Sequence, residues 1–186
     1  LLRKSHEKLE SDVKNRTEEL RVTNQRLEQE LIATRNAQAA VESTERRFQL
    51  MADNAPVLIW VSDLSKGCVW FNNPWLEFVG HTLEHELGNG WARNVHPDDF
   101  DYCLRVYESA FDAKREFKMQ YRLRRHDGEW RWLLDHGVPR LEGDNRFVGF
   151  IGSCIDITEH KEALASVRDS EELLSGIFNS AMDAII

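Results

Sequence analysis

The sequence lacks long apolar runs, paired cysteines and an N-terminal secretory pattern. No window approaches the ~18–20 continuous apolar residues that a membrane-spanning helix needs. The charged first third contains no leader-like stretch. The three cysteines, Cys68, Cys103 and Cys154, are far apart and lack CxxC spacing. They favour a reducing compartment and predict neither a disulfide framework nor a metal site. We therefore expect a cytoplasmic setting, which leaves open a membrane anchor upstream in a longer parent protein.

Basic residues are fewer than acidic residues in this chain. It has 24 Lys and Arg against 32 Asp and Glu, a formal net charge of -8. Because phosphate binding needs clustered Lys and Arg, nucleic acid is not an expected partner. The sequence also lacks a glycine-rich phosphate loop and a nucleophile with an adjacent base motif. We expect no catalytic residue and no enzyme activity within these residues.

Residues 1–45 contain neither Gly nor Pro and are predicted to form one long helix. Apolar or core-like residues recur in alternating steps of three and four, the heptad of a coiled coil. The row includes Val13, Leu20, Asn24, Leu27, Leu31 and Val41. A helix ~70 Å long cannot fold back on one small domain, so we predict a parallel homodimer. Asn24 is interpreted as a residue that fixes the register and the oligomeric state of the coil. A second interpretation, that the imperfect coil switches between two packings, can hold at the same time.

From residue 46 the composition changes, and all six Trp lie between residues 60 and 132. Period-two alternation, short apolar runs and turn residues predict five strands. They are placed at residues 57–61, 68–71, 117–124, 129–139 and 147–155. Helices are predicted at 75–79 and 98–113, with short helical turns between them. This order predicts an α+β domain, a five-stranded antiparallel sheet with short helices on one face.

Several motifs follow one another through this region. They are Phe71–Trp75, Phe78–Gly80, Trp91, His96–Asp99, Tyr121–Gly128, Trp130–Trp132, Gly149–Gly152 and Asp156–Glu159. In kind and order they resemble a PAS domain with its C-terminal PAC segment, over residues 46–158. The resemblance implies a PAS-like fold, in which the sheet and the helices sometimes enclose a ligand. The HPDD and RRxDGxxRW strings most resemble the PAS class common in bacterial multidomain sensors.

The resemblance extends to both flanks of this domain. Residues 1–45 look like the signalling coil that commonly precedes such domains, and residues 178–186 resemble the start of a second PAS domain. Because the chain also begins with Leu rather than Met, we expect an internal piece of a tandem-PAS protein. Residues 159–177 are predicted to form an exit helix between the two domains.

The start of the exit helix is the predicted relay. Asp156 and Glu159 have capping-box spacing, and Thr158 is itself a potential cap. The residues Asp156, Ile157 and Thr158 match the family's Asp-Ile-Thr motif. The resemblance implies that this motif couples the sheet to the exit helix.

No cofactor signature of the family is present. Flavin photosensors of this fold use a cysteine just after the short helices, and residues 87–94 have none. Haem-binding relatives place a histidine on the longest helix, and residues 98–113 have none. The sequence therefore predicts no haem, flavin or metal. The aromatic residues are interpreted as a filled core, with a small apolar or aromatic ligand as the alternative. The candidate pocket residues are Trp60, Phe71, Trp75, Phe78, Trp91, Met119, Tyr121, Trp132 and His136.

The leading functional prediction is a non-catalytic sensory and signal-relay module of a bacterial two-component sensor histidine kinase. It would dimerise through the coil and act on a downstream PAS domain and a kinase or other output domain in the same chain. We expect no membrane contact by these residues. Two alternatives stay open. One is the input module of a cyclic-di-GMP enzyme, a diguanylate cyclase or phosphodiesterase, and the other is a sensor that binds a small ligand or cofactor.

Overall fold

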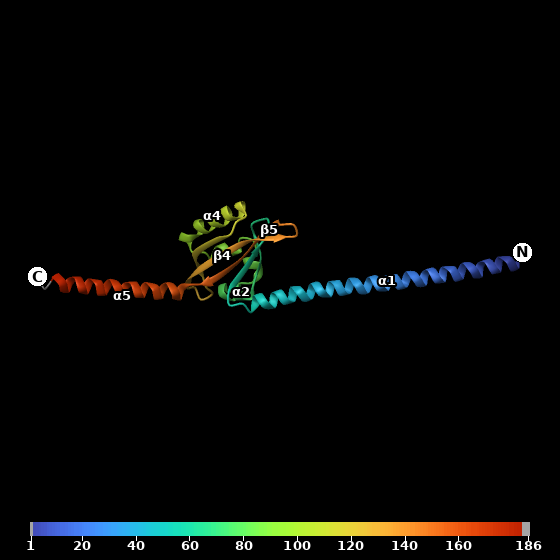
Figure 1. Ribbon diagram of the computed structural model, residues 1–186, viewed down its shortest axis with the longest axis horizontal. Helices are drawn as coiled ribbons and strands as arrows, with labels where there is room; N and C mark the ends of the chain where they lie inside the picture. The colour runs from blue at the N-terminus through green and yellow to red at the C-terminus, as the bar shows by residue number, and fades with distance from the viewer. Residues whose placement is uncertain (1, 184–186) are drawn as a thin grey trace. The chain divides into compact units, whose positions relative to one another are not determined.

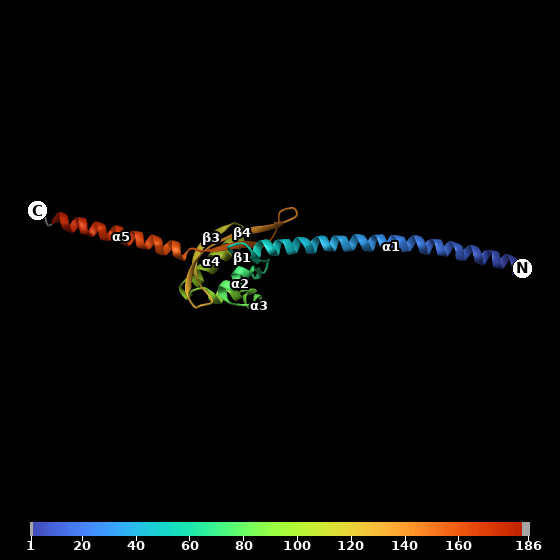
Figure 2. The same ribbon diagram turned by 90° about the horizontal axis from the view of Figure 1, so that it is seen from below.

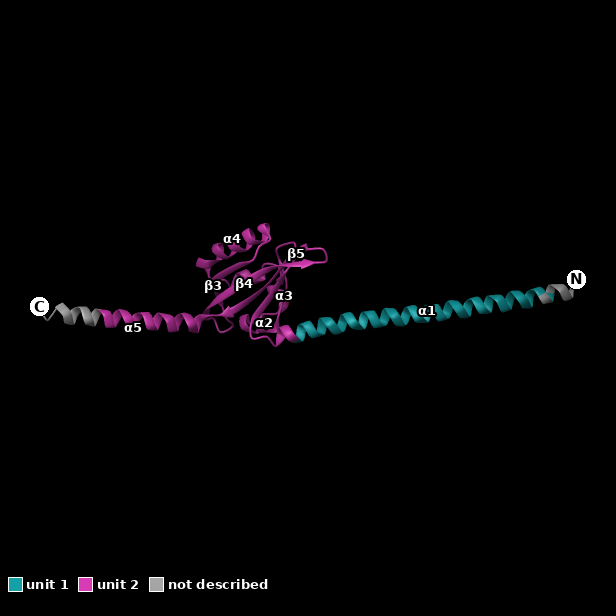
Figure 3. Ribbon diagram, in the orientation of Figure 1, with its two compact units in different colours: residues 1–50 teal, residues 51–186 magenta. Residues whose placement is uncertain are grey.

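The computed structural model divides the chain into two units, residues 1–50 and 51–186 (Figure 3). It describes the backbone of residues 2–183 and the side chains of residue 6 and residues 8–175. Figure 1 labels most of the elements, and we keep its labels. In chain order they are α1 (Leu2–Asp53), β1 (Leu58–Ser62), β2 (Cys68–Phe71), α2 (Asn73–Val79), α3 (Leu83–Glu86), the 3-10 helix η1 (Gly90–Asn94), α4 (Pro97–Ala113), β3 (Phe117–Arg124), β4 (Trp130–Glu142), β5 (Arg146–Asp156) and α5 (Thr158–Asp183).

Helix α1 confirms the predicted long N-terminal helix and continues past residue 45 as far as Asp53. Each side chain between residues 8 and 50 is exposed, including the whole predicted coil row. Leu20 and Leu27 are 63% and 56% exposed. The apolar row of α1 therefore has no cover within the described part of residues 1–50.

The sheet confirms the predicted five-stranded antiparallel architecture. Its strand order is β2-β1-β5-β4-β3, and every neighbouring pair is antiparallel. Gly152 on β5 pairs with Trp60 on one side and Gly137 on the other. A Cβ at Gly152 would overlap the Trp60 indole, and a Cβ at Gly137 would overlap the Phe117 ring. The two glycines thus leave room for large rings on the inner face of the sheet.

Helices α2, α3, η1 and α4 cover this inner face (Figures 1 and 2). Pro97 stands at the start of α4, and the carboxylates of Asp98 and Asp99 lie at the positive end of its dipole, as the sequence predicts. Between the sheet and the helices lies one core, in which Leu133, Phe150 and Cys154 are fully buried. Nine of the twenty buried residues of this core are aromatic.

Asn72 fixes the start of this domain. Its buried side chain accepts hydrogen bonds from the N–H groups of Ile59 (2.8 Å) and Trp75 (3.2 Å). Its amide donates to the carbonyls of Ala52 (2.8 Å) and Val57 (2.9 Å). One side chain therefore ties the last turn of α1 to β1 and to the first turn of α2. Because all four bonds are buried or partly buried, losing this side chain would leave several backbone groups unpaired.

The C-terminal segment is one helix. Helix α5 runs without interruption from Thr158 to Asp183, across the predicted boundary between the exit helix at 159–177 and the second PAS domain at 178–186. Residues 184–186 lie outside the described residues. The assignment of residues 178–186 to a second domain stays a prediction.

Candidate functional site

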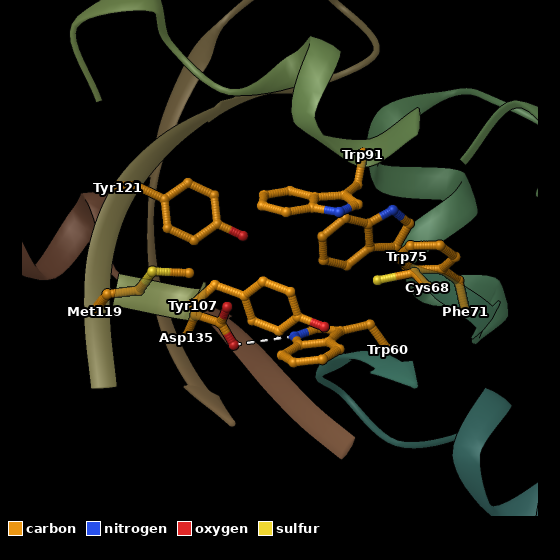
Figure 4. A pocket seen from close by; sticks show the side chains of 9 residues that line it. All are labelled: Trp60, Cys68, Phe71, Trp75, Trp91, Tyr107, Met119, Tyr121 and Asp135. Carbon is orange, nitrogen blue, oxygen red and sulfur yellow. Dashed lines mark hydrogen bonds between the residues drawn. The ribbon is translucent and has the colours of Figure 1, made fainter. Parts of the chain in front are cut away.

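A small cavity lies between the sheet and its covering helices (Figure 4). Its volume is about 20 Å³, which is room for roughly one water molecule. Four strands and two helices contribute side chains to it, and η1 contributes one more. The lining residues are Trp60, Cys68, Phe71, Trp75, Trp91, Tyr107, Met119, Tyr121 and Asp135. Three indoles and two phenols make the wall predominantly aromatic.

Asp135 contributes the carboxyl group of the cavity. Its side chain is 2% exposed, and its Oδ1 accepts a hydrogen bond from Trp60 Nε1 at 3.0 Å, the dashed line in Figure 4. Burial raises the pKa of this carboxyl to about 7, and the Trp60 hydrogen bond opposes part of that rise. Among the described residues no cation forms an ion pair with it. A buried carboxyl without a cationic partner is a candidate functional group.

Trp91 contributes a free hydrogen-bond donor. Its indole is buried, and among the described residues Nε1 has no hydrogen-bond partner. The phenols are placed differently: Tyr107 donates to the Lys66 carbonyl at 3.0 Å, and Tyr121 lies 3.8 Å from the Cys154 sulfur. An unpaired buried donor costs free energy. The cavity therefore favours an occupant that accepts a hydrogen bond.

Three buried thiols surround the core. Burial raises the pKa of Cys103 to about 12 and also raises the pKa of Cys68 and of Cys154. Since the thiolate is the nucleophile, these cysteines are unreactive while the domain is folded. All three belong to the hydrophobic core, where a cysteine behaves as a small apolar packing residue.

A second buried carboxyl lies behind the cavity wall. Glu86 is fully buried and accepts a hydrogen bond from Trp75 Nε1 at 3.0 Å. Its other oxygen lies 2.8 Å from His81 Nδ1 and accepts from the Asn94 amide at 3.2 Å. Both carboxylate oxygens are thus satisfied, and the indole of Trp75 is fixed in its position beside the cavity.

The structure corrects three of the nine predicted pocket residues. Trp132 and His136 lie on the outer face of β4, because the inward positions of that strand are Leu133, Asp135 and Gly137. Phe78 is partly buried against the core but does not line the cavity. The other six predicted residues do line it.

The error on β4 has a physical cause. Along β4, the large aromatic side chains lie on one face and Asp135 and Gly137 on the other. Hydrophobicity alone therefore predicts that the aromatic face points into the core, which is wrong. The inward register holds glycine because the Phe117 ring occupies that space. The sequence analysis also missed Cys68, Tyr107 and Asp135 as lining residues. A rule that pairs glycines on neighbouring strands with facing aromatics could have found this register.

The predicted relay residues form a hydrogen-bonded junction. Asp156 Oδ2 accepts from Arg131 Nε at 2.8 Å, and its Oδ1 accepts from the Thr158 N–H at 2.9 Å. Thr158 Oγ1 accepts from the Trp132 N–H at 2.8 Å, and the Ile157 N–H donates to the Trp132 carbonyl at 2.8 Å. The pKa of Asp156 is lowered overall, because these hydrogen bonds outweigh the opposing effect of burial.

The described residues contain neither a cluster of metal ligands nor a membrane-spanning helix. Among the described side chains, those of residue 6 and residues 8–175, no group of three or more His, Cys, Asp and Glu is placed to hold a metal ion. In the same part of the chain, no helix combines the length and the apolar character that a bilayer crossing requires.

Comparison with known proteins adds the family. The PAS fold family profile matches residues 69–154. An uncharacterised protein, y4lL, of Sinorhizobium fredii is 42% identical over 124 residues, 67% of this chain and 15% of its own length. The peroxide stress-activated histidine kinase mak1 of Schizosaccharomyces pombe is 28% identical over 154 residues, 78% of this chain and 9% of its own. The two-component sensor PprA of Pseudomonas aeruginosa is 26% identical over 142 residues, 74% of this chain and 15% of its own.

A solved structure supports the same fold. The PAS domain of a Colwellia psychrerythraea protein superposes with a TM-score of 0.53 at 22% identity, covering 62% of this chain and 98% of its own. The sheet, its helical cover and the family match together identify a sensory domain, and the sheet domain of this chain is a PAS domain. The chain spans only 9–15% of the length of the three relatives compared.

Proposed function

We propose that this chain is the sensory and signal-relay PAS module of a bacterial two-component sensor histidine kinase. It is non-catalytic, cytoplasmic and dimeric through α1, and it acts on an output domain elsewhere in the same protein. The observation that carries the proposal is the uncovered apolar row on α1, which leads into a PAS domain whose last strand passes directly into α5. The relatives mak1 and PprA are described as a histidine kinase and a two-component sensor, which supports the output assignment.

The surface of α1 supports the proposed dimerisation. Its row of apolar side chains is more than half exposed at Val13, Leu20 and Leu27. Intrahelical pairs such as Arg21 with Glu18 and Arg26 with Glu30 support an isolated helix only weakly. A second copy that buries the row supplies the missing stabilisation and joins two PAS domains.

Sedimentation equilibrium of the 186-residue chain over a range of concentrations tests the dimer. The natural chain is expected to sediment as two copies, and the double variant Leu20→Asp/Leu27→Asp as one. Val22→Asp is the matched control, since Val22 is exposed on α1 but lies outside the row. A chain that stays monomeric at every concentration contradicts the proposal.

Signal output is tested in the full-length parent. Asp156→Ala removes the acceptor of Arg131 and Thr158 at the start of α5, so the change in autophosphorylation between its two signalling states should shrink several-fold. A parent whose ATP-dependent histidine phosphorylation is absent would contradict the kinase assignment. A parent that makes cyclic-di-GMP instead would favour the diguanylate cyclase alternative.

A second candidate function is a sensor of a small ligand, and the unpaired Trp91 donor beside the buried Asp135 favours it. Native mass spectrometry, with a denatured control, measures any bound mass. A reproducible excess that Trp91→Phe abolishes supports ligand sensing. The same mass in both variants would place the ligand elsewhere.

A further inference from the structure

Arg122 and Trp132 form one rung on the outer face of the sheet. They are register partners on β3 and β4. Both side chains are half-buried. Each of the two residues also holds the first turn of a helix.

Arg122 holds the start of α4. Its guanidinium donates to both carboxylate oxygens of Asp99, from Nε at 2.8 Å and from a terminal nitrogen at 2.8 Å. Its backbone N–H donates to Asp99 Oδ2 at 2.9 Å, and its carbonyl accepts from the His96 N–H at 2.9 Å. The bidentate, charge-assisted geometry makes this a strong contact between α4 and the sheet.

Trp132 holds the start of α5. Its backbone N–H and carbonyl bond to Thr158 and Ile157, as described above. In addition, the ammonium of Lys161 lies over its indole, 4.3 Å from the ring centroid. Lys161 belongs to the first turn of α5, where its N–H donates to the Ile157 carbonyl at 2.9 Å.

The two anchors touch each other. The guanidinium carbon of Arg122 lies over the same indole, 5.3 Å from the centroid. We propose that Trp132 is a positioning residue that couples the start of α4 to the start of α5 through Arg122 and Lys161. Because Tyr107 on α4 lines the cavity, a shift of α4 would reach the exit helix through this rung. The inference deepens the proposed relay function and rests on it for its biological meaning, but the coupling itself is measurable in this chain alone.

Amide hydrogen exchange of the 186-residue chain tests the coupling. Asp99→Asn weakens the Arg122 contact on α4. If the rung couples the helices, exchange of the Thr158 and Lys161 amides should accelerate about threefold or more, while amides of β1 and β5 keep their rates. A purely structural role would instead accelerate exchange in all strands together. Unchanged α5 rates beside accelerated α4 rates would overturn the proposal.

The decisive comparison repeats Asp99→Asn in a Trp132→Leu background. The proposal requires that the effect of Asp99→Asn on α5 disappears there, since the ring that joins the two cations is gone. A persisting effect would overturn it. If Trp132→Leu does not fold, Lys161→Met serves as the background, because it removes the cation and leaves the sheet intact.

Rescue and control variants separate the ring from the backbone. Trp132→Phe keeps an aromatic face, so it should retain part of the coupling that Trp132→Leu loses.

Lys118→Met is the matched control, since Lys118 is an exposed cation on the same face of β3, in register with His136. It should leave α5 exchange unchanged. Loss of coupling in this control would assign the effect to the charge of the face rather than to Trp132. If the variants abolish the coupling in this chain and yet leave autophosphorylation of the parent unchanged, that outcome would refute the relay function and leave the coupling intact.

Discussion

Helix α1 and the PAS domain differ in how their apolar side chains are covered. The domain buries its aromatic side chains against each other within one chain. The helix exposes every described side chain between residues 8 and 50, including a row of leucines and valines. The domain should therefore be stable at any protein concentration, whereas the stability of α1 should depend on concentration. The comparison teaches that the domain is stabilised by contacts within one chain, whereas α1 would be stabilised by the second copy in the proposed dimer.

The largest expected effect breaks the domain and spares the helix. Phe150 is fully buried and packs against the rings of Tyr107, Phe111, Phe117 and Phe147. Phe150→Ala should lower the unfolding free energy of the domain by about 3–5 kcal/mol, through lost burial and a new cavity. Urea unfolding followed by tryptophan fluorescence measures it.

The control for this change is Leu141→Ala, at an exposed position of β4 in the same domain. It should alter the unfolding free energy by no more than about 0.5 kcal/mol. Equal losses from both variants would mean that the aromatic core does not dominate the stability of the domain.

An intermediate effect makes the domain sensitive to pH. The pKa of Asp135 is raised from an ordinary value of 3.8 to about 7 by burial. Between these values the folded domain binds more protons than the unfolded chain, so its unfolding free energy falls as the pH rises, and it levels off above the folded pKa. From pH 5 to pH 8 the loss should be on the order of 2 kcal/mol.

Asp135→Asn removes this titration while keeping an oxygen that can accept from Trp60. The variant should lack the fall between pH 5 and pH 8, and should gain stability relative to the natural chain at pH 8. Thermal unfolding of both proteins across this range gives the result. Parallel pH profiles would show that Asp135 is ionised in the folded domain throughout.

The smallest expected effect strengthens the helix and leaves the domain alone. Asn24 occupies a core position of the proposed coil, where a polar side chain lowers stability and specifies register. Asn24→Leu should tighten self-association by about tenfold and broaden the range of oligomers. Sedimentation over a concentration series measures both. If the affinity is unchanged, Asn24 lies outside the interface.

Local patterns predicted most of the fold, because strands, turns and caps depend on neighbouring residues. The alternation in β3 and the Pro97 start of α4 are examples that the structure confirms. The inward face of β4 could not be predicted in the same way. Its register depends on Phe117 and on Gly152 of β5, which are distant in sequence. The same error assigned Trp132 to the pocket, whereas its contacts lie with Arg122 and Lys161.

The sequence favours a filled aromatic core, with a ligand site as the alternative, and does not predict the carboxyl group of the cavity. Six of the residues that line the cavity were among the candidates, because they are large apolar or aromatic residues. The carboxyl of Asp135 could not, since an aspartate in a strand is ordinarily expected to face solvent. Only the three-dimensional register shows that it faces inward beside Trp60.

The alkylation of the three buried cysteines can also serve as a measure of when the domain opens. With pKa values raised by burial, Cys68, Cys103 and Cys154 stay unmodified by an alkylating reagent while the core is closed. They lie in β2, in α4 and in β5 respectively. The order in which they become alkylated therefore reveals whether the edge strand β2, the helix α4 or the central strand β5 loosens first, without any label being introduced.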